Sequence, residues 1–125
     1  MLFLDTNALI WLYQGELNKF SESIKIKLEE ADLVISPVVK LELQYLFETK
    51  RIDKNSSQII DYLYKTIGLI LHNVPLTILI EESLKHDWTR DPFDRLIVSH
   101  ASIENAELVT RDQIILKNYL KALWE

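Results

Sequence analysis

Four acidic residues stand at positions where a buried apolar side chain would be expected. Asp5 ends an apolar run at the start of the chain, and Asp112 follows another that ends at Val109. Glu42 and Asp94 lie on apolar helical stripes. Carboxylates that meet in one place repel, and each raises the pKa of the others. Because hard divalent cations with oxygen ligands relieve this repulsion, the pattern predicts a Mg²⁺ or Mn²⁺ site.

Helical spacing directs Glu42 and Asp94 toward the interior. The residues three or four positions from Glu42 are apolar on both sides: Val38, Val39, Tyr45 and Leu46. Asp94 begins a stripe that continues with Ile97, Val98 and Ala101. A cation held by such acids lowers the pKa of a bound water, so the chemistry expected here is hydrolytic phosphoryl transfer.

Each acid also has a structural interpretation. Asp5 and Asp112 could be helix N-caps, because aspartate is a preferred cap. Asp94 could complement a helix dipole in the first turn. Glu42 could pair with a lysine or arginine on a neighbouring element. Considered together, the four placements favour one cluster over four separate structural roles.

Other catalytic machinery finds little support. The chain has no cysteine, which excludes disulfides, thiol catalysis and cysteine-ligated zinc, and its two glycines form no phosphate-binding loop. The histidines lack metal-ligand spacing and are expected to be core or surface residues: His72, His86 and His100. The three tryptophans are expected to pack and not to stack on bases, with the one in the loop before Asp91 the best candidate for another role: Trp11, Trp88 and Trp124.

Composition indicates one domain spanning residues 1–125. Hydrophobic residues make up 48% of the 125, enough for a core, and no signal segment or membrane-spanning run is visible, which predicts a cytoplasmic protein without a membrane partner. A net charge of −5 argues against a large nonspecific nucleic-acid binder. It does not exclude a nuclease, since bound cations would offset part of the charge.

Short apolar runs alternate with amphipathic stretches along the chain. Strands are expected up to residue 5 and at 33–35, 69–74 and 107–110, with a possible edge strand at 120–124. Helices are expected at 7–15, 21–30, 37–49, 56–67, 75–86 and 93–105, with a short one after Asp112. The order predicts an α/β/α architecture around a parallel sheet of four to five strands. Ligand crevices in such sheets lie at the carboxyl ends of the strands.

Four segments together resemble a known family. They read LDTNALIWL from Leu4, SPVVKLEL from Ser36, RDPFDRLIVSHA from Arg90 and LVTRD from Leu108. These resemble the successive motifs of PIN-domain ribonucleases, and the short chain resembles the VapC-type toxins of toxin–antitoxin modules. The resemblance implies a PIN-like fold, Mg²⁺- or Mn²⁺-dependent endoribonuclease activity on single-stranded RNA, a homodimer and a cognate antitoxin.

The resemblance also implies roles for individual residues. The four family acids match Asp5, Glu42, Asp94 and Asp112, the first and third binding the principal metal directly. Asp91 is assigned to the loop that shapes the site, paired with Arg95 four residues later. Candidates for orienting the carboxylates are Thr6, Asn7 and Thr110. Candidates for contacting RNA phosphates are Arg90, Arg95 and Arg111.

Two other functions are compatible with the sequence. A housekeeping nuclease that processes RNA or DNA would share the fold and the acids. A noncatalytic binding module would use the acids structurally. The small size and the lack of an added RNA-binding segment favour the toxin.

Overall fold

The computed structural model describes residues 1–125 and is built on a five-stranded parallel sheet with the order β3-β2-β1-β4-β5. The strands are β1 (Leu2–Leu4), β2 (Leu33–Ile35), β3 (Ile70–Leu71), β4 (Glu107–Val109) and β5 (Ala122–Leu123). In the central pairing, Leu4 of β1 lies opposite Val109 of β4. Asp5 and Thr110 therefore follow neighbouring strands at the same edge. The predicted α/β class and parallel sheet are confirmed.

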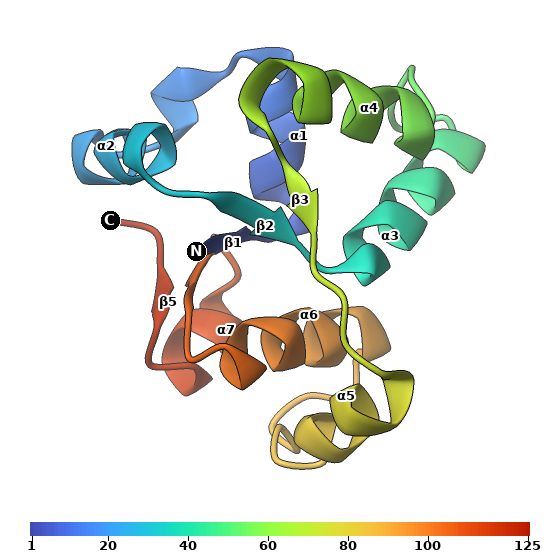
Figure 1. Ribbon diagram of the computed structural model, residues 1–125, viewed down its shortest axis with the longest axis vertical. Helices are drawn as coiled ribbons and strands as arrows, with labels where there is room; N and C mark the ends of the chain where they lie inside the picture. Colours follow the sequence, from blue (N-terminus) through green and yellow to red (C-terminus); the bar gives the residue numbers. More distant parts are fainter.

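Helices cover both faces of the sheet. They are α1 (Thr6–Gln14), the 3₁₀ turn η1 (Leu17–Lys19), α2 (Glu22–Glu30), α3 (Pro37–Glu48), α4 (Ser56–Ile67), α5 (Leu76–Ser83), α6 (Pro92–Ile103) and α7 (Gln113–Asn118). Figure 1 shows α1, α2 and α4 on one side and α5, α6 and α7 on the other. Helix α3 stands beside the end of the sheet and packs against α4 and α6.

The helix boundaries follow from residues that satisfy free backbone groups. Ser36 accepts from the backbone N–H of Val38, and proline occupies the first position of α3. Asn55 and Gln58 form a reciprocal capping box at the start of α4. Gly68 ends α4 with a φ of 71°, a left-handed conformation in which glycine avoids steric strain. The predicted order of helices and strands is therefore confirmed.

Two differences from the prediction have local causes. Helix α5 ends at Ser83 instead of continuing to His86, because the backbone N–H groups of Lys85 and His86 bond to carbonyls three residues back instead of four, and Arg95 Nε donates to the Ser83 carbonyl at 2.9 Å. The turn η1 was not predicted; it lies between Gly15, which ends α1, and the cap of α2.

One hydrophobic cluster of 25 buried residues lies between the sheet and its helices. The central strand β1 contributes Leu2, Phe3 and Leu4, each only 1% exposed. This burial on both faces explains why the central strands are continuous apolar runs. None of the helices combines the length and the apolar character that a membrane crossing requires.

Candidate active site

Five carboxylates line one cleft of about 560 Å³ at the carboxyl end of the sheet. They belong to Asp5, Glu42, Asp91, Asp94 and Asp112. Strands β1 and β4 are neighbours, so the residues that follow them reach the same edge. Helices α3 and α6 contact each other and supply the remaining acids. Acids separated by up to 107 positions thus share one cleft.

Asp5 is fixed by two neutral donors. The Thr6 backbone N–H donates to Oδ1 at 2.7 Å, and the Thr110 hydroxyl donates to Oδ2 at 2.6 Å. Thr110 is itself fully buried, and its Oγ1 also accepts from the backbone N–H of Asp112 at 3.1 Å. One threonine therefore connects two of the acids, which agrees with its predicted role in orienting carboxylates.

Asp91 and Asp112 cap helices and face the cleft at the same time. Oδ1 of Asp91 accepts from the backbone N–H groups of Phe93 and Asp94. Oδ1 of Asp112 likewise accepts from two backbone N–H groups at the start of α7, both at 2.9 Å. In each carboxylate Oδ2 accepts no protein hydrogen bond. Capping therefore fixes the side chain and leaves one oxygen available to a ligand.

Glu42 and Asp94 differ in how they are held. Glu42 Oε1 accepts a hydrogen bond from the Thr6 hydroxyl, so Thr6 fixes Asp5 through its backbone N–H and Glu42 through its side chain. The Asp94 carboxylate accepts no hydrogen bond from the protein. It lies in the first turn of α6, three residues after Asp91 and on the same side of the helix. Asp94 is thus the least stabilised anion of the group.

The electrostatics of the cleft reflect burial and like charge. Burial, followed by the charges of Asp91, Asp5, Asp112 and Glu42, raises the pKa of Asp94 from 3.8 to about 7. Burial also raises the pKa of Asp5, partly offset by the hydrogen bond from Thr110. The pKa of Glu42 is raised by burial, against the hydrogen bond from Thr6, and further by the charge of Asp5. Without a counter-charge, the site disfavours its own full ionisation.

Basic side chains do not neutralise these acids. The ion pairs of the molecule lie elsewhere, on α2, α5 and the β4 edge and beside the buried histidines. The predicted pair between Asp91 and Arg95 does not form, because Arg95 donates to the carbonyl oxygens of Ser83 and Thr89 at 2.9 and 3.2 Å. Arg95 therefore ties α6 to α5 and the loop between them. The interpretation of Glu42 as half of an ion pair is likewise wrong.

The remaining predicted residues divide between the cleft and its surroundings. Asn7 and Arg111 line the cleft, whereas exposed Arg90 does not. Sequence reasoning missed Arg51, in the loop after α3, which lines the cleft. Trp11 packs on other aromatic rings as expected, but it also lines the cleft, which was not predicted. The spacing of Trp11 could have revealed it, since Trp11 stands four positions after Asn7 and so shares its helix face.

The histidines lie outside this cleft. His72 and His100 are buried and hydrogen-bond through their Nδ1 atoms at 2.7 Å, and His72 Nε2 contacts Glu104 at 3.2 Å. Burial, together with the neighbouring His72, lowers the pKa of His100 to about 4. The pair therefore links the end of β3 to α6 as part of the core, as the sequence predicted.

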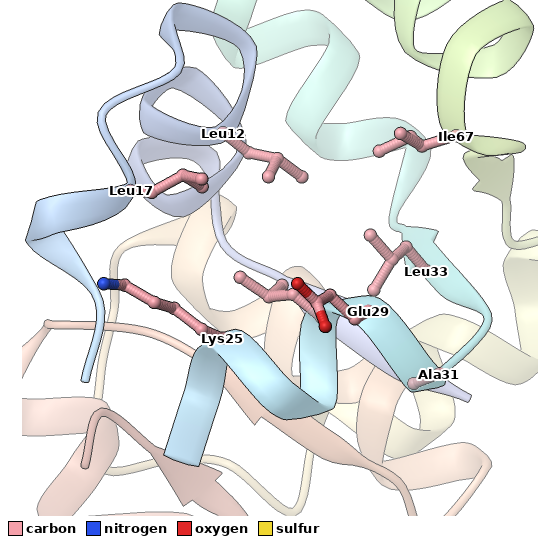
Figure 2. A pocket seen from close by; sticks show the side chains of 8 residues that line it. Leu12, Leu17, Lys25, Glu29, Ala31, Leu33 and Ile67 are labelled. Carbon is pink, nitrogen blue, oxygen red and sulfur yellow. The ribbon is translucent and has the colours of Figure 1, made fainter. Parts of the chain in front are cut away.

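A second cavity, of about 420 Å³, lies at the amino end of the strands. Figure 2 shows it between α1, α2, the start of β2 and the end of α4. Its lining is mainly apolar and consists of Leu12, Leu17, Lys25, Leu28, Glu29, Ala31, Leu33 and Ile67. It has one carboxylate and one amine, so it offers no cluster of metal ligands.

Comparison with known protein families identifies the family of this chain. A model described as the PIN domain matches residues 2–119, nearly the whole chain. The chain belongs to the PIN-domain family. Among curated proteins, no sequence gives a significant match.

Three solved structures share this PIN fold. A chain of VapBC2 from Rickettsia felis, bound to a DNA fragment from their promoter, has a TM-score of 0.69 and 22% identity over 100% of both chains. A toxin–antitoxin complex from Klebsiella pneumoniae gives 0.65 and 20%, covering 98% of this chain and 96% of that one. DNA-bound VapBC from Salmonella typhimurium gives 0.62 and 19%, covering 99% and 96%. These likenesses establish the fold.

The donor set of this PIN domain suits a hard divalent cation. Five of the candidate ligands in the cleft are carboxylates, and all of them except Asp5 have at least one oxygen that accepts no protein hydrogen bond. No group of three or more histidine or acidic side chains is close enough to surround one ion. Mg²⁺ fits such a cleft, because it characteristically takes one or two carboxylates and completes its shell with water and phosphate oxygens.

Proposed function

We propose that this PIN domain is a metal-dependent endoribonuclease that hydrolyses RNA phosphodiester bonds and acts as the toxin of a toxin–antitoxin pair. The observation that carries the proposal is the convergence of five carboxylates in one cleft with only neutral hydrogen-bond donors. A structural cluster of this kind would be expected to include basic partners, because burying unpaired charge is costly. A bound divalent cation would supply the missing positive charge, and an RNA phosphodiester would be the substrate.

The roles of the acids follow from how each is held. Asp5 and Asp94 are the principal metal ligands, the first fixed by Thr6 and Thr110 and the second free of protein hydrogen bonds. Glu42 and Asp112 contribute further ligand oxygens, directly or through water. When bound, Mg²⁺ or Mn²⁺ supplies a Lewis acid that lowers the pKa of a water molecule for attack on the phosphodiester.

Asp91 has a larger role in this proposal than in the loop assignment made from the sequence. Its Oδ1 atom caps α6, its Oδ2 atom accepts no protein hydrogen bond, and the residue lines the cleft. Its charge contributes to the raised pKa of Asp94. Asp91 therefore fixes the N-terminus of the helix that carries Asp94 and adds to the negative potential that attracts a cation.

A cleavage assay tests the enzymatic proposal. Mn²⁺ is titrated into purified protein with a fluorescent unstructured RNA, comparing wild type with Asp5→Ala and Asp94→Asn. Asp61→Asn, at an exposed aspartate of α4, is the matched control. We expect metal-dependent cleavage by wild type and the control only. If wild type and the cleft variants were equally inactive at every metal concentration, the proposal would be wrong.

The assignment to a toxin is supported by the fold likeness to chains from VapBC and toxin–antitoxin complexes. It implies that an antitoxin protein binds this chain and suppresses cleavage. Expression of wild type alone should arrest growth, Asp94→Asn should not, and co-expression of a neighbouring short reading frame should restore growth. Normal growth with full nuclease activity in vitro would instead favour a housekeeping processing enzyme.

Homodimerisation is the remaining proposed assembly. Helix α5 offers a candidate face, because Leu76, Ile80 and Leu84 are 43–67% exposed and spaced four residues apart. Sedimentation of wild type and Ile80→Glu would measure the assembly. We expect a dimer for wild type and a monomer for the variant.

A further inference from the structure

Besides its acids, the cleft contains one aromatic and two basic side chains. Trp11, Arg51 and Arg111 also line it. Neither arginine forms an ion pair with any of the five carboxylates. The inference that follows rests on the proposed ribonuclease function and concerns how one nucleotide of the substrate is held.

The Trp11 side chain is held in place by two other aromatic rings. Its ring centroid lies 6.4 Å from Phe20 and 5.5 Å from Trp124, and these two rings lie 5.6 Å from each other. The three aromatics come from α1, the segment before α2 and the C-terminal segment. Because the indole is already packed on these rings, presenting an edge or face to a ligand costs little conformational entropy.

The residues next to Arg111 in the chain place it beside the Trp11 ring. Thr110 donates to Asp5, and Asp112 caps α7, so the backbone on both sides of Arg111 is anchored. The Arg111 guanidinium lies 5.5 Å from the Trp11 ring centroid, within the range of a cation–π interaction. Lys19 Nζ lies at the same distance from that ring. The indole therefore contacts two cationic side chains and also lines the acidic cleft.

Arg51 is the second arginine of the cleft and comes from a different part of the chain. It follows α3, the helix after β2, whereas Arg111 follows β4, and β1 lies between these two strands. The Arg51 backbone N–H donates to the Leu46 carbonyl at 2.8 Å, which anchors the loop at the cleft. Both arginines therefore line the cleft together with the acids, and guanidinium groups are suited to bind the phosphates of an RNA chain.

We propose that Trp11 and Arg111 form a subsite for one unpaired nucleotide next to the scissile phosphate, with its base against the indole and its phosphate on Arg111. Arg51, which lines the same cleft, contacts another phosphate of the RNA backbone. Aromatic side chains and guanidinium groups are the usual platforms for unstacked bases, and a base inside a duplex cannot reach them. This subsite makes the enzyme selective for single-stranded RNA.

The first test measures binding without cleavage. A fluorescent unstructured 10-nucleotide RNA is titrated into the full chain carrying Asp94→Asn, alone or combined with Trp11→Phe, Trp11→Leu or Arg111→Ala. Loss of base stacking is expected to weaken binding about 5- to 100-fold for Trp11→Leu, while Trp11→Phe keeps most of the affinity. Lys117→Ala, at an exposed cation on α7, is the matched control and should have little effect. Equal affinities of the phenylalanine and leucine variants would overturn the subsite.

The second test assigns the contact to a base. Bases of the RNA are removed one at a time, leaving abasic positions, and binding is measured in the Asp94→Asn background with and without Trp11→Leu. With Trp11 present, we expect removal of the base at one position of the RNA to weaken binding. With Trp11→Leu, removal of that same base should have no effect, which would show that the base and the tryptophan interact directly. A uniform response across positions, identical in both proteins, would overturn the proposal. Because Trp11→Phe retains an aromatic ring, it keeps the comparison informative if the leucine variant folds poorly.

Cleavage separates this inference from the function on which it rests. In the wild-type background, Trp11→Leu should raise KM more than it lowers kcat. Metal-dependent cleavage with unchanged KM in Trp11→Leu would overturn the subsite and leave the ribonuclease proposal intact. RNA binding that depends on Trp11, with no cleavage at any metal concentration, would support the subsite and overturn the ribonuclease proposal.

Discussion

The two ends of the sheet carry cavities of similar size and opposite chemistry. The carboxyl end has the cleft of about 560 Å³ with five carboxylates. The amino end has the cavity of about 420 Å³ lined mainly by leucine, isoleucine and alanine (Figure 2). Both are formed by junctions between the same kinds of element, so the difference arises from which ends of the strands and helices meet there.

The direction of the chain explains this difference. At the carboxyl end, strands stop and helices begin, so free backbone N–H groups and the positive ends of helix dipoles favour carboxylates. Asp5, Asp91 and Asp112 all accept from such groups. At the amino end, α1 and α4 terminate and their last apolar residues, Leu12 and Ile67, pack near the start of β2. One end therefore supports ionic chemistry, and the other contributes hydrophobic contact.

The largest expected effect is loss of cleavage at the carboxyl end. Asp5→Asn or Asp94→Asn should lower kcat/KM for RNA by about 100-fold or more, because a bound metal contributes several kcal/mol to catalysis. The variants should remain folded, since each removes a repelling charge. Rates are measured with a fluorogenic RNA, and unfolding is followed by circular dichroism. Retained activity in both variants would show that the acids are not the catalytic centre.

At the amino end, a substitution should affect stability and leave catalysis unchanged. Leu28 is 9% exposed, and Leu28→Ala should lower the free energy of unfolding by about 2–3 kcal/mol through lost burial and a larger cavity. Ile26→Ala, on the same helix but 55% exposed, is the matched control and should change it by less than about 0.5 kcal/mol. Urea unfolding and cleavage per folded molecule are measured together. A large loss of kcat in folded Leu28→Ala would contradict the separation of the two ends.

Removing an orienting hydroxyl should have an intermediate effect. Thr110→Val deletes the 2.6 Å hydrogen bond to Asp5 while keeping the side-chain shape. Loss of such a supporting contact typically reduces metal affinity or activity about 10- to 100-fold. Thr66→Val, whose hydroxyl binds only its own helix backbone, is the matched control. Mn²⁺ affinity is read by electron paramagnetic resonance, and equal affinities in the two variants would argue against an orienting role.

The smallest effect concerns stability against pH without metal. The pKa of Asp94 is raised from 3.8 to about 7, so the folded protein holds a proton that the unfolded chain releases between these values. The contribution of Asp94 to stability is therefore fully present below about pH 4, is lost as the pH rises toward 7 and is constant above it. Asp5 and Glu42, also raised, act in the same direction. Asp94→Asn should flatten this slope and Asp61→Asn should not, as measured by urea unfolding without metal; identical slopes would contradict the assignment.

The sequence predicted the fold from local signals. Apolar runs marked the strands, and residues such as Ser36 and Pro37 marked helix starts, because capping and burial act over a few positions. It also singled out Asp5 and Asp112, since each follows a strand that ends at the same edge. For both, the structural and functional interpretations turned out to be compatible: a cap uses one carboxylate oxygen and leaves the rest of the side chain in the cleft.

What the sequence could not predict depended on contacts between distant segments. The order of the strands has no local signature. The role of Trp11 depends on Phe20 and Trp124, the latter 113 positions away, and that of Arg51 on the path of the loop after α3. From the sequence, Asp91 was assigned to a loop and Asp94 to the metal site, although a spacing of three residues in a helix already implies a shared face.

The most direct test of the acidic cleft as a cation site is calorimetric titration of Mn²⁺ at pH 7 in two buffers of different ionisation enthalpy. Because the pKa of Asp94 is about 7 without metal, wild type should bind Mn²⁺ with partial release of a proton. Asp94→Asn should bind more weakly and release less. Equal affinity and equal proton release in wild type and Asp94→Asn would contradict the assignment of Asp94 as a principal ligand of the cation.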